Sequence, residues 1–220
     1  MEATAVRRPN ERSGRDPTKE TSAPPTSGAM SIADPAPLGL AAFALTTFVL
    51  SFFNAGIVSD KGEPVVLGLA LAYGGFAQLL AGMWEFRNNN TFGATAFTSY
   101  GAFWLSFWAF NQFFASKVPA GELGAAVGLY LIAWGIFTTY MWIASFRTTA
   151  AVSVVFLLLA ITYIVLGIGE SGGSTGVVKA GGWIGIATAI AAWYASFAGV
   201  ANSTFGRTVM PVRPLNVNNR

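Results

Sequence analysis

The chain lacks both cysteine and histidine, since neither occurs among its 220 residues. Thiolate and imidazole groups are the usual protein ligands for zinc, copper and iron–sulfur clusters, and they serve most nucleophilic and proton-shuttling sites. We therefore expect no metal site, no bound cofactor and no catalytic residues. The sequence predicts that this protein is not an enzyme.

Charge is also scarce, because only 10% of the residues are Asp, Glu, Lys or Arg, whereas 53% are hydrophobic. This balance is far from that of an ordinary soluble domain and is typical of a chain whose solvent is lipid. The net charge of +3 comes from 13 basic and 10 acidic residues, without a dense basic cluster that could follow a phosphate backbone. No nucleic-acid partner is expected.

The hydrophobic residues are concentrated in six runs, each close to the ~20 residues that a helix needs to cross a ~30 Å hydrocarbon layer. The runs lie near residues 37–57, 64–84, 94–115, 122–144, 150–169 and 178–202. They predict an all-α integral membrane protein in which six transmembrane helices form a bundle.

The first 33 residues differ from the rest in being rich in Arg, Pro, Ser, Thr and Glu, which is typical of disordered segments. They contain no apolar stretch long enough for the hydrophobic region of a signal peptide. We predict a disordered N-terminal tail over residues 1–33, a six-helix membrane domain over 34–210 and a short C-terminal tail over 211–220.

Basic residues near the predicted helix ends indicate which side of the membrane each end faces. Six would lie on the side of the N-terminus and three on the opposite side: Lys19, Arg87, Arg147, Arg207, Arg213 and Arg220 against Lys61, Lys117 and Lys179. Because Lys and Arg are enriched in cytosolic loops, both termini are predicted to be cytosolic.

No charged residue lies at the predicted middle of any helix, and Glu85 falls at the cytosolic end of the second run. A proton relay through the bilayer centre usually needs such a group, so a narrow neutral pathway is the better expectation. A polar side chain in hydrocarbon costs about 2–7 kcal/mol unless it is paired. Thr47, Asn54 and Gln78 are therefore candidate pathway residues.

Two interpretations of Gln78, the deepest amide, remain open: a hydrogen bond between helices, or a position facing a pore. Other residues point to packing alone. Glycine pairs such as Gly124 and Gly128 indicate close contact between helices. The tryptophans, Trp104 among them, are typical of interface anchors or packing residues, and we assign them no chemistry.

Three separated motifs carry a resemblance to a known family. The first comprises Asp34, Pro35, Ala36, Pro37, Leu38, Gly39 and Leu40; the second lies within residues 90–101 as NTFG and TAFTSYG; the third is FGRTV at 205–209. In this order, on six hydrophobic runs, they resemble the acetate uptake transporter family, also called succinate–acetate permeases. The similarity extends from about residue 34 to 211.

The resemblance implies a homohexamer in which each protomer has its own pore. It implies movement of acetate, and in some members succinate or other short carboxylates, across the inner (plasma) membrane. The family's pore narrows at an aromatic and aliphatic gate. By position relative to the motifs, that gate corresponds to Phe43, Tyr100 and Leu159, which the residue types alone would describe as packing residues.

One departure from the family concerns Asp34, because the opening motif usually begins with Asn. Either residue caps a helix that has proline in its first turn, so the fold should be preserved. The added negative charge could slow the exit of an anion. Two other functions remain open: a channel for small neutral solutes, and a membrane scaffold that transports nothing.

Overall fold

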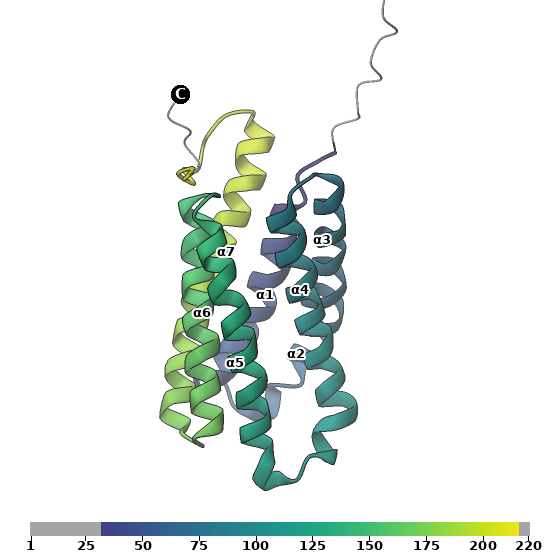
Figure 1. Cartoon of the computed structure of the whole chain (residues 1–220), viewed down its shortest axis with the longest axis vertical. Helices are drawn as coiled ribbons and strands as arrows, with labels where there is room; N and C mark the ends of the chain where they lie inside the picture. The colour runs from purple at the N-terminus through teal and green to yellow at the C-terminus, as the bar shows by residue number, and fades with distance from the viewer. Residues whose placement is uncertain (1–31, 216–220) are drawn as a thin grey trace, which may run out of the picture. The chain divides into compact units, whose positions relative to one another are not determined.

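The computed structural model describes residues 32–215, so the predicted tail over residues 1–33 lies almost wholly outside the described part (Figure 1). The described residues are almost entirely helical. The helices are α1 (Ala36–Asn54), α2 (Val65–Leu71), α3 (Gln78–Arg87), α4 (Thr91–Ala109), α5 (Ala120–Ser145), α6 (Ala150–Ser171) and α7 (Thr175–Phe205).

Two π-helical segments join these helices into longer ones. The segment Ala72–Ala77 connects α2 to α3, so that Val65–Arg87 forms one continuous helix, and the segment Phe110–Phe114 extends α4. Between residues 32 and 215 the chain therefore forms six long helical segments, one for each of the six predicted runs. π-Helical turns often occur at functional sites, and the second one contributes to a cavity described below.

Five of the six segments are long and apolar enough to cross a membrane by length and composition. The exception is α4, in which Thr, Ser, Gly and Tyr side chains alternate with the apolar ones. The membrane character of the bundle is thus confirmed for five helices. The polar residues that lower the hydropathy of α4 are concentrated in the motif that it carries.

Local sequence signals fix where several helices begin. The Asp34 carboxylate accepts a hydrogen bond of 3.0 Å from the Ala36 backbone N–H, just before the proline in the first turn of α1. The Asn90 side chain caps α4 by accepting from the Gly93 N–H, also at 3.0 Å. Asp34 and Asn90, which belong to the first and second motifs, therefore stabilise the N-terminal ends of α1 and α4.

The helices pack in two groups that meet at α1. Helices α5, α6 and α7 contact one another in chain order, α7 lies along α1, and α3 lies along α4 (Figure 1). Contacts between α4 and α5 are sparse by comparison. Small residues permit the close approaches: a Cβ atom on Gly128 of α5 would lie 2.7 Å from the Gly167 carbonyl oxygen of α6.

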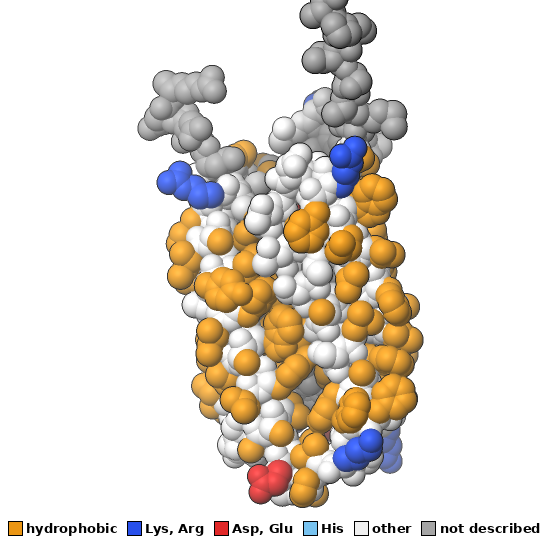
Figure 2. Space-filling model, turned by 45° about the vertical axis from the view of Figure 1, so that its right-hand side comes forward, with side chains coloured by type: hydrophobic (Ala, Val, Ile, Leu, Met, Phe, Trp, Pro, Cys, Tyr) orange, Lys and Arg blue, Asp and Glu red, His pale blue; other side chains and the backbone are white. Residues whose placement is uncertain are grey.

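The surface matches a lipid environment along its length and water at its ends. Figure 2 shows apolar side chains over most of one face, with basic side chains at both ends and an acidic one at the lower end. Large apolar residues such as Leu129 and Ile136 are more than half exposed. In an aqueous protein such faces would be unfavourable, whereas lipid solvates them.

The C-terminal segment folds back against the bundle. Gly206 ends α7 with a left-handed φ of 62°, and the following residues run along the start of α6. The Ala150 N–H donates to the Arg213 carbonyl at 2.8 Å, and the Tyr194 hydroxyl donates to the Pro211 carbonyl at 2.7 Å. Of the predicted tail over 211–220, residues 211–215 are therefore held in place, while 216–220 lie outside the described range.

Candidate functional site

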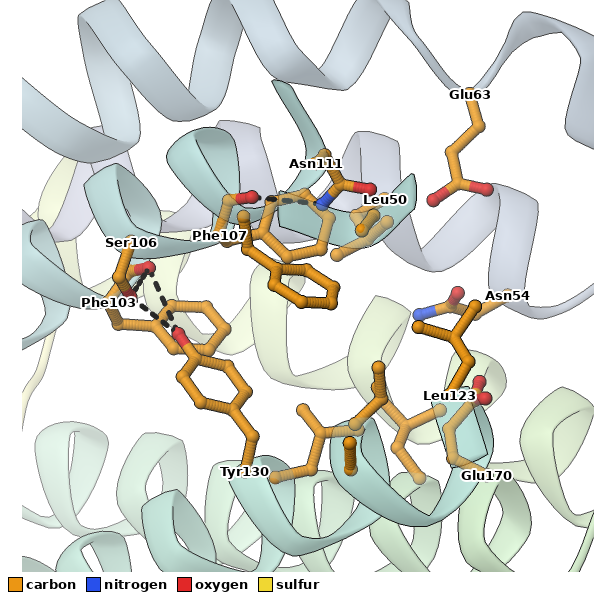
Figure 3. A pocket seen from close by; sticks show the side chains of 16 residues that line it. Leu50, Asn54, Glu63, Phe103, Ser106, Phe107, Asn111, Leu123, Tyr130 and Glu170 are labelled. Atoms are coloured by element: carbon orange, nitrogen blue, oxygen red, sulfur yellow. Dashed lines mark hydrogen bonds between the residues drawn. The ribbon is translucent and has the colours of Figure 1, made fainter. Parts of the chain in front are cut away.

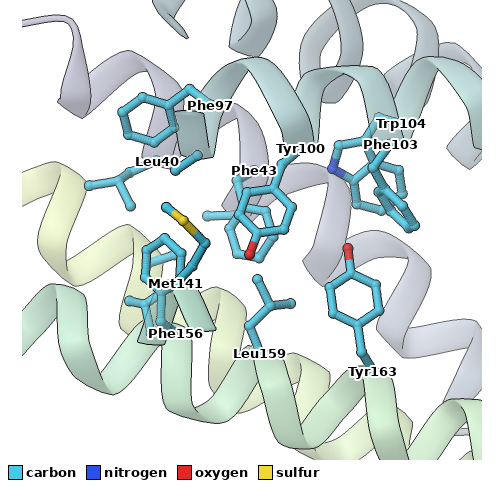
Figure 4. Packing of buried hydrophobic residues seen from close by; sticks show 14 of the residues in the cluster. Leu40, Phe43, Phe97, Tyr100, Phe103, Trp104, Met141, Phe156, Leu159 and Tyr163 are labelled. Atoms are coloured by element: carbon cyan, nitrogen blue, oxygen red, sulfur yellow. The ribbon is translucent and has the colours of Figure 1, made fainter. Parts of the chain in front are cut away.

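The three residues expected to form a gate come together in the centre of the bundle. Phe43 of α1, Tyr100 of α4 and Leu159 of α6 line one small cavity of about 20 Å³. All three side chains are at most 4% exposed, and the Phe43 and Tyr100 ring centroids lie 6.0 Å apart. Figure 4 shows them facing one another from three helices. We call this space the gate cavity.

Helix direction explains why residues so distant in sequence meet here. Helices α1, α4 and α6 all begin at the same end of the bundle, because each is followed by a helix that returns (Figure 1). Phe156 also lines the cavity, and its ring centroid lies 6.0 Å from that of Tyr100.

The Tyr100 hydroxyl is held by Thr138 of α5, at an oxygen–oxygen distance of 3.0 Å. Thr138 in turn donates its single hydroxyl proton to the Trp134 carbonyl at 2.7 Å. Because a threonine hydroxyl has one proton, Tyr100 must be the donor in the first bond. The Tyr100 proton is therefore engaged in the bond to Thr138.

Gln78 lines the same cavity and is only 1% exposed. Its side-chain oxygen has no hydrogen-bond partner among the protein atoms that the structure describes. An unpaired buried acceptor costs about 1–3 kcal/mol. In this structure that oxygen makes no hydrogen bond between helices, and a position facing a pore stays a prediction.

A much larger cavity, of about 440 Å³, lies toward the C-terminal ends of α1, α4 and α6. We call it the vestibule. Figure 3 shows Asn54 between Glu63 and Glu170 on one side of it, with Ser106 and Tyr130 on the other. The Ser106 and Tyr130 hydroxyl groups form a hydrogen bond with an oxygen–oxygen distance of 2.7 Å.

The charged side chains that line the vestibule are both carboxylates. Glu63 lies just before α2, and burial raises the pKa of its carboxyl above the usual range, with smaller contributions from Asp60 and Glu170. Each of these influences disfavours the ionised form. The vestibule is therefore acidic but loses charge more readily than a solvated pair of glutamates would.

Two of the three predicted pathway residues line a cavity, whereas Thr47 lines neither. Gln78 lies at the gate cavity and Asn54 at the vestibule. On α1, Thr47 lies between Phe43 of the gate cavity and Asn54 of the vestibule. It is 7% exposed, and its hydroxyl oxygen has no hydrogen-bond partner among the described atoms. No metal is suggested by the arrangement: within residues 32–215, no three acidic side chains gather closely enough to hold an ion.

The sequence analysis missed several residues in and near the two cavities. Glu63, Glu170 and Tyr163 were not singled out there. Trp104 was given no chemistry, yet it is 2% exposed and its indole nitrogen is unpaired among the described atoms. The available signal was helical spacing, because positions four residues after a pore-facing residue lie on the same face.

Comparisons with known proteins agree with this architecture. A model of the GPR1/FUN34/yaaH family matches residues 18–217. The ammonia transport outward protein 2 of Saccharomyces cerevisiae is 46% identical over 174 residues, which cover 77% of this chain and 62% of that protein. This chain thus spans less than two thirds of its yeast relatives.

Two bacterial proteins match over almost their full length. The succinate-acetate/proton symporter SatP of Escherichia coli K12 is 37% identical over 185 residues, covering 84% of this chain and 97% of that one. The solved structure of the bacterial acetate channel SatP superposes with a TM-score of 0.78 at 36% identity, covering 83% of this chain and 99% of that one. The chain therefore belongs to the GPR1/FUN34/yaaH family, which confirms the resemblance to the acetate uptake transporters carried by its three motifs.

Proposed function

We propose that this protein moves acetate, and also succinate or other short carboxylates, across a membrane through the vestibule and the gate cavity. The observation that carries the proposal is the meeting of Phe43, Tyr100 and Leu159 with Gln78 around one buried cavity of about 20 Å³. The names of the bacterial relatives, a symporter and a channel, both refer to acetate.

The proposed mechanism is selection by size and hydration at a neutral constriction. The gate cavity is lined by apolar and aromatic side chains with a single amide. Such a ring removes water from a small solute and rejects ions that hold their hydration shells tightly. A carboxylate with a short apolar tail satisfies both demands, since Gln78 can receive its polar end while the methyl group contacts Leu159.

The same proposal places all six helical segments across the cell membrane, including α4, with both termini in the cytosol. The end at which α1 begins and α7 ends carries Arg87, Arg147, Arg207 and Arg213, as cytosolic ends do. The absence of cysteine from the sequence makes a direct test simple. A Lys61→Cys variant should react with an impermeant thiol reagent added outside intact cells, and an Arg147→Cys variant should react only after the cells are opened.

We also propose that six copies assemble, each with its own pathway. Large apolar side chains on the outer faces, such as Leu129 and Ile136, are available for contact with lipid or with another copy. Native mass spectrometry of the purified protein in detergent should give six times the mass of one chain. A monomer as the only species would contradict this assembly.

A channel for small neutral solutes is the second candidate. It is favoured by the uncharged gate cavity and by the name of the yeast relative, which refers to ammonia. Its flux would ignore acetate, whereas a scaffold would show no flux at all.

The deciding experiment is uptake of labelled acetate by proteoliposomes that contain the purified protein, with and without an inward proton gradient. Flux above empty liposomes that is lost in Tyr100→Ala supports the proposal, and stimulation by the gradient indicates proton coupling. Folded protein that gives no acetate flux, but passes methylammonium or ammonia, would move the neutral-solute channel ahead.

A further inference from the structure

A groove of about 320 Å³ lies where the C-terminal segment, residues 206–215, returns along α6 and α7 (Figure 1). It shares no lining residue with the gate cavity or the vestibule. Its lining is apolar except for Tyr194 of α7 and Arg213 of the C-terminal segment. Two residues of its walls, Val154 and Tyr194, are 47% and 37% exposed, so the groove opens on the outside of the bundle. We call it the C-terminal groove.

Hydrogen bonds to α6 and α7 fix the wall of this groove that the C-terminal segment forms. The Tyr194 hydroxyl donates to the Pro211 carbonyl at 2.7 Å, and the Asn202 side chain bonds to backbone groups of two further residues of the segment. Arg213 has a left-handed φ of 51°, which is uncommon for a residue other than glycine. Its carbonyl accepts from the Ala150 N–H at 2.8 Å. The backbone that carries Arg213 is therefore held beside the groove.

The charges near the C-terminal groove are positive. Arg147 lies in the turn that leads into α6, and the Leu215 N–H donates to a carbonyl of the same turn at 2.9 Å. Arg147 and Arg213 are both exposed and thus lie at the start of α6. Between residues 123 and 215 the only acidic residue is Glu170, which lies at the other end of that helix. An anionic group at the groove would therefore meet two guanidinium groups without a competing carboxylate from α6, α7 or the C-terminal segment.

An apolar groove with arginines at one end matches a ligand that has an anionic head and an apolar chain. The planar guanidinium group suits the oxygens of a phosphate, and the cytosolic leaflet of a membrane contains anionic lipids. We propose that the C-terminal groove binds one anionic glycerophospholipid of that leaflet, with its phosphate at Arg147 and Arg213 and an acyl chain along the apolar lining. This inference rests on the proposed orientation of the chain in the membrane and not on what the chain transports.

Native mass spectrometry of the purified, delipidated protein in detergent tests the head-group contact. Phosphatidylglycerol should bind with a Kd about tenfold lower than phosphatidylcholine of the same acyl chains, because only the first has a net charge for the arginines. Arg147→Gln combined with Arg213→Gln should bring the two Kd values within about twofold. The control, Lys61→Gln combined with Lys117→Gln, removes the same charge from exposed positions at the other end and should keep the preference. Equal Kd values in the unaltered protein, or a preference that the arginine variant retains, would overturn the site.

A substitution that fills the groove tests the acyl-chain contact without a change of charge. Val154→Trp places an indole in the C-terminal groove and should raise the Kd for phosphatidylglycerol about tenfold. Val200→Trp of α7 is the matched control, because Val200 is 50% exposed and does not line the groove. Unchanged binding in both variants would overturn the proposed position of the lipid. Lipid binding is measured without flux, so its failure leaves acetate transport intact, and a lack of acetate flux leaves the lipid site intact.

Discussion

The gate cavity and the vestibule share lining residues from α1, α4 and α6 but differ in volume and in polarity. The gate cavity holds about 20 Å³ and has one amide residue, Gln78, among its lining residues, whereas the vestibule holds about 440 Å³ and has two carboxylate and two amide residues among its own. Volume and polarity fall together along the pathway. Under the proposed function, this difference predicts that capture and selection occur at separate places.

The contrast has a physical reason. A wide polar cavity leaves a carboxylate hydrated, so it discriminates little between acids. The narrow cavity requires loss of that water, so a change of one methylene or one hydroxyl in the solute has a larger energetic effect there. Substitutions of the same kind should therefore have unequal effects in the two regions.

The largest expected effect comes from placing the same bulky residue in each region. Leu159→Trp should close the gate cavity and lower acetate uptake by on the order of 100-fold, since no space remains for the added ring. Leu131→Trp in the vestibule, where the volume is about 440 Å³, should keep most of the uptake. Similar losses in both variants, with monodisperse protein confirmed by size-exclusion chromatography, would remove the distinction between the regions.

The amide of the gate cavity gives the next largest effect. Gln78→Leu should lower acetate uptake by about tenfold, because a hydrogen bond to the carboxylate is lost at the point of greatest dehydration. Gln112→Leu in the exposed π-helical turn is the matched control. If Gln78 served packing alone, the leucine variant would transport normally and unfold at a higher temperature.

A smaller effect is expected from the acidic vestibule and depends on pH. Because burial raises the pKa of Glu63, its carboxyl becomes protonated at a higher pH than a free glutamate would. As pH falls through that raised pKa, the vestibule loses negative charge and repels acetate less, so the KM should fall. Glu63→Gln should flatten this change by about two- to threefold, whereas Glu122→Gln, on the exposed first turn of α5, should not. Parallel pH profiles in all three proteins would contradict this role.

The smallest effect concerns Asp34, which stands before α1 where the family usually has Asn. Asn can accept the Ala36 N–H bond that Asp34 accepts now, so Asp34→Asn should leave stability unchanged. Removing the charge should speed acetate release at the cytosolic end by no more than about twofold. Matching initial uptake rates for the two proteins would show that this charge has no part in exit.

Much of the fold could be predicted from the sequence because lipid imposes simple requirements. Runs of about 20 apolar residues predict helices, and each predicted run corresponds to a helical segment within residues 32–215. The two π-helical turns were not predicted, because the apolar runs that contain them carry no pattern that distinguishes a π-helical turn from an α-helical one. The return of residues 211–215 along α6 depends on backbone bonds that carry no side-chain signal.

The site was predictable only in part. Phe43, Tyr100 and Leu159 were identified through family motifs, because a buried Phe or Leu looks like any packing residue. The vestibule glutamates were not found, since Glu63 and Glu170 are far apart in sequence and only the fold brings them to one cavity. Trp104 was missed because a tryptophan in a membrane helix looks like an interface anchor, although its spacing of four residues from Tyr100 places both on one face of α4.

The most direct test of selection at the gate is the ratio of succinate or lactate uptake to acetate uptake in Leu159→Ala, measured in proteoliposomes beside the unaltered protein. Leu159 is 3% exposed and borders a cavity of about 20 Å³, so its truncation should open space for larger acids and raise this ratio by about tenfold. An unchanged ratio in folded, acetate-transporting protein would place the selection elsewhere and contradict the account.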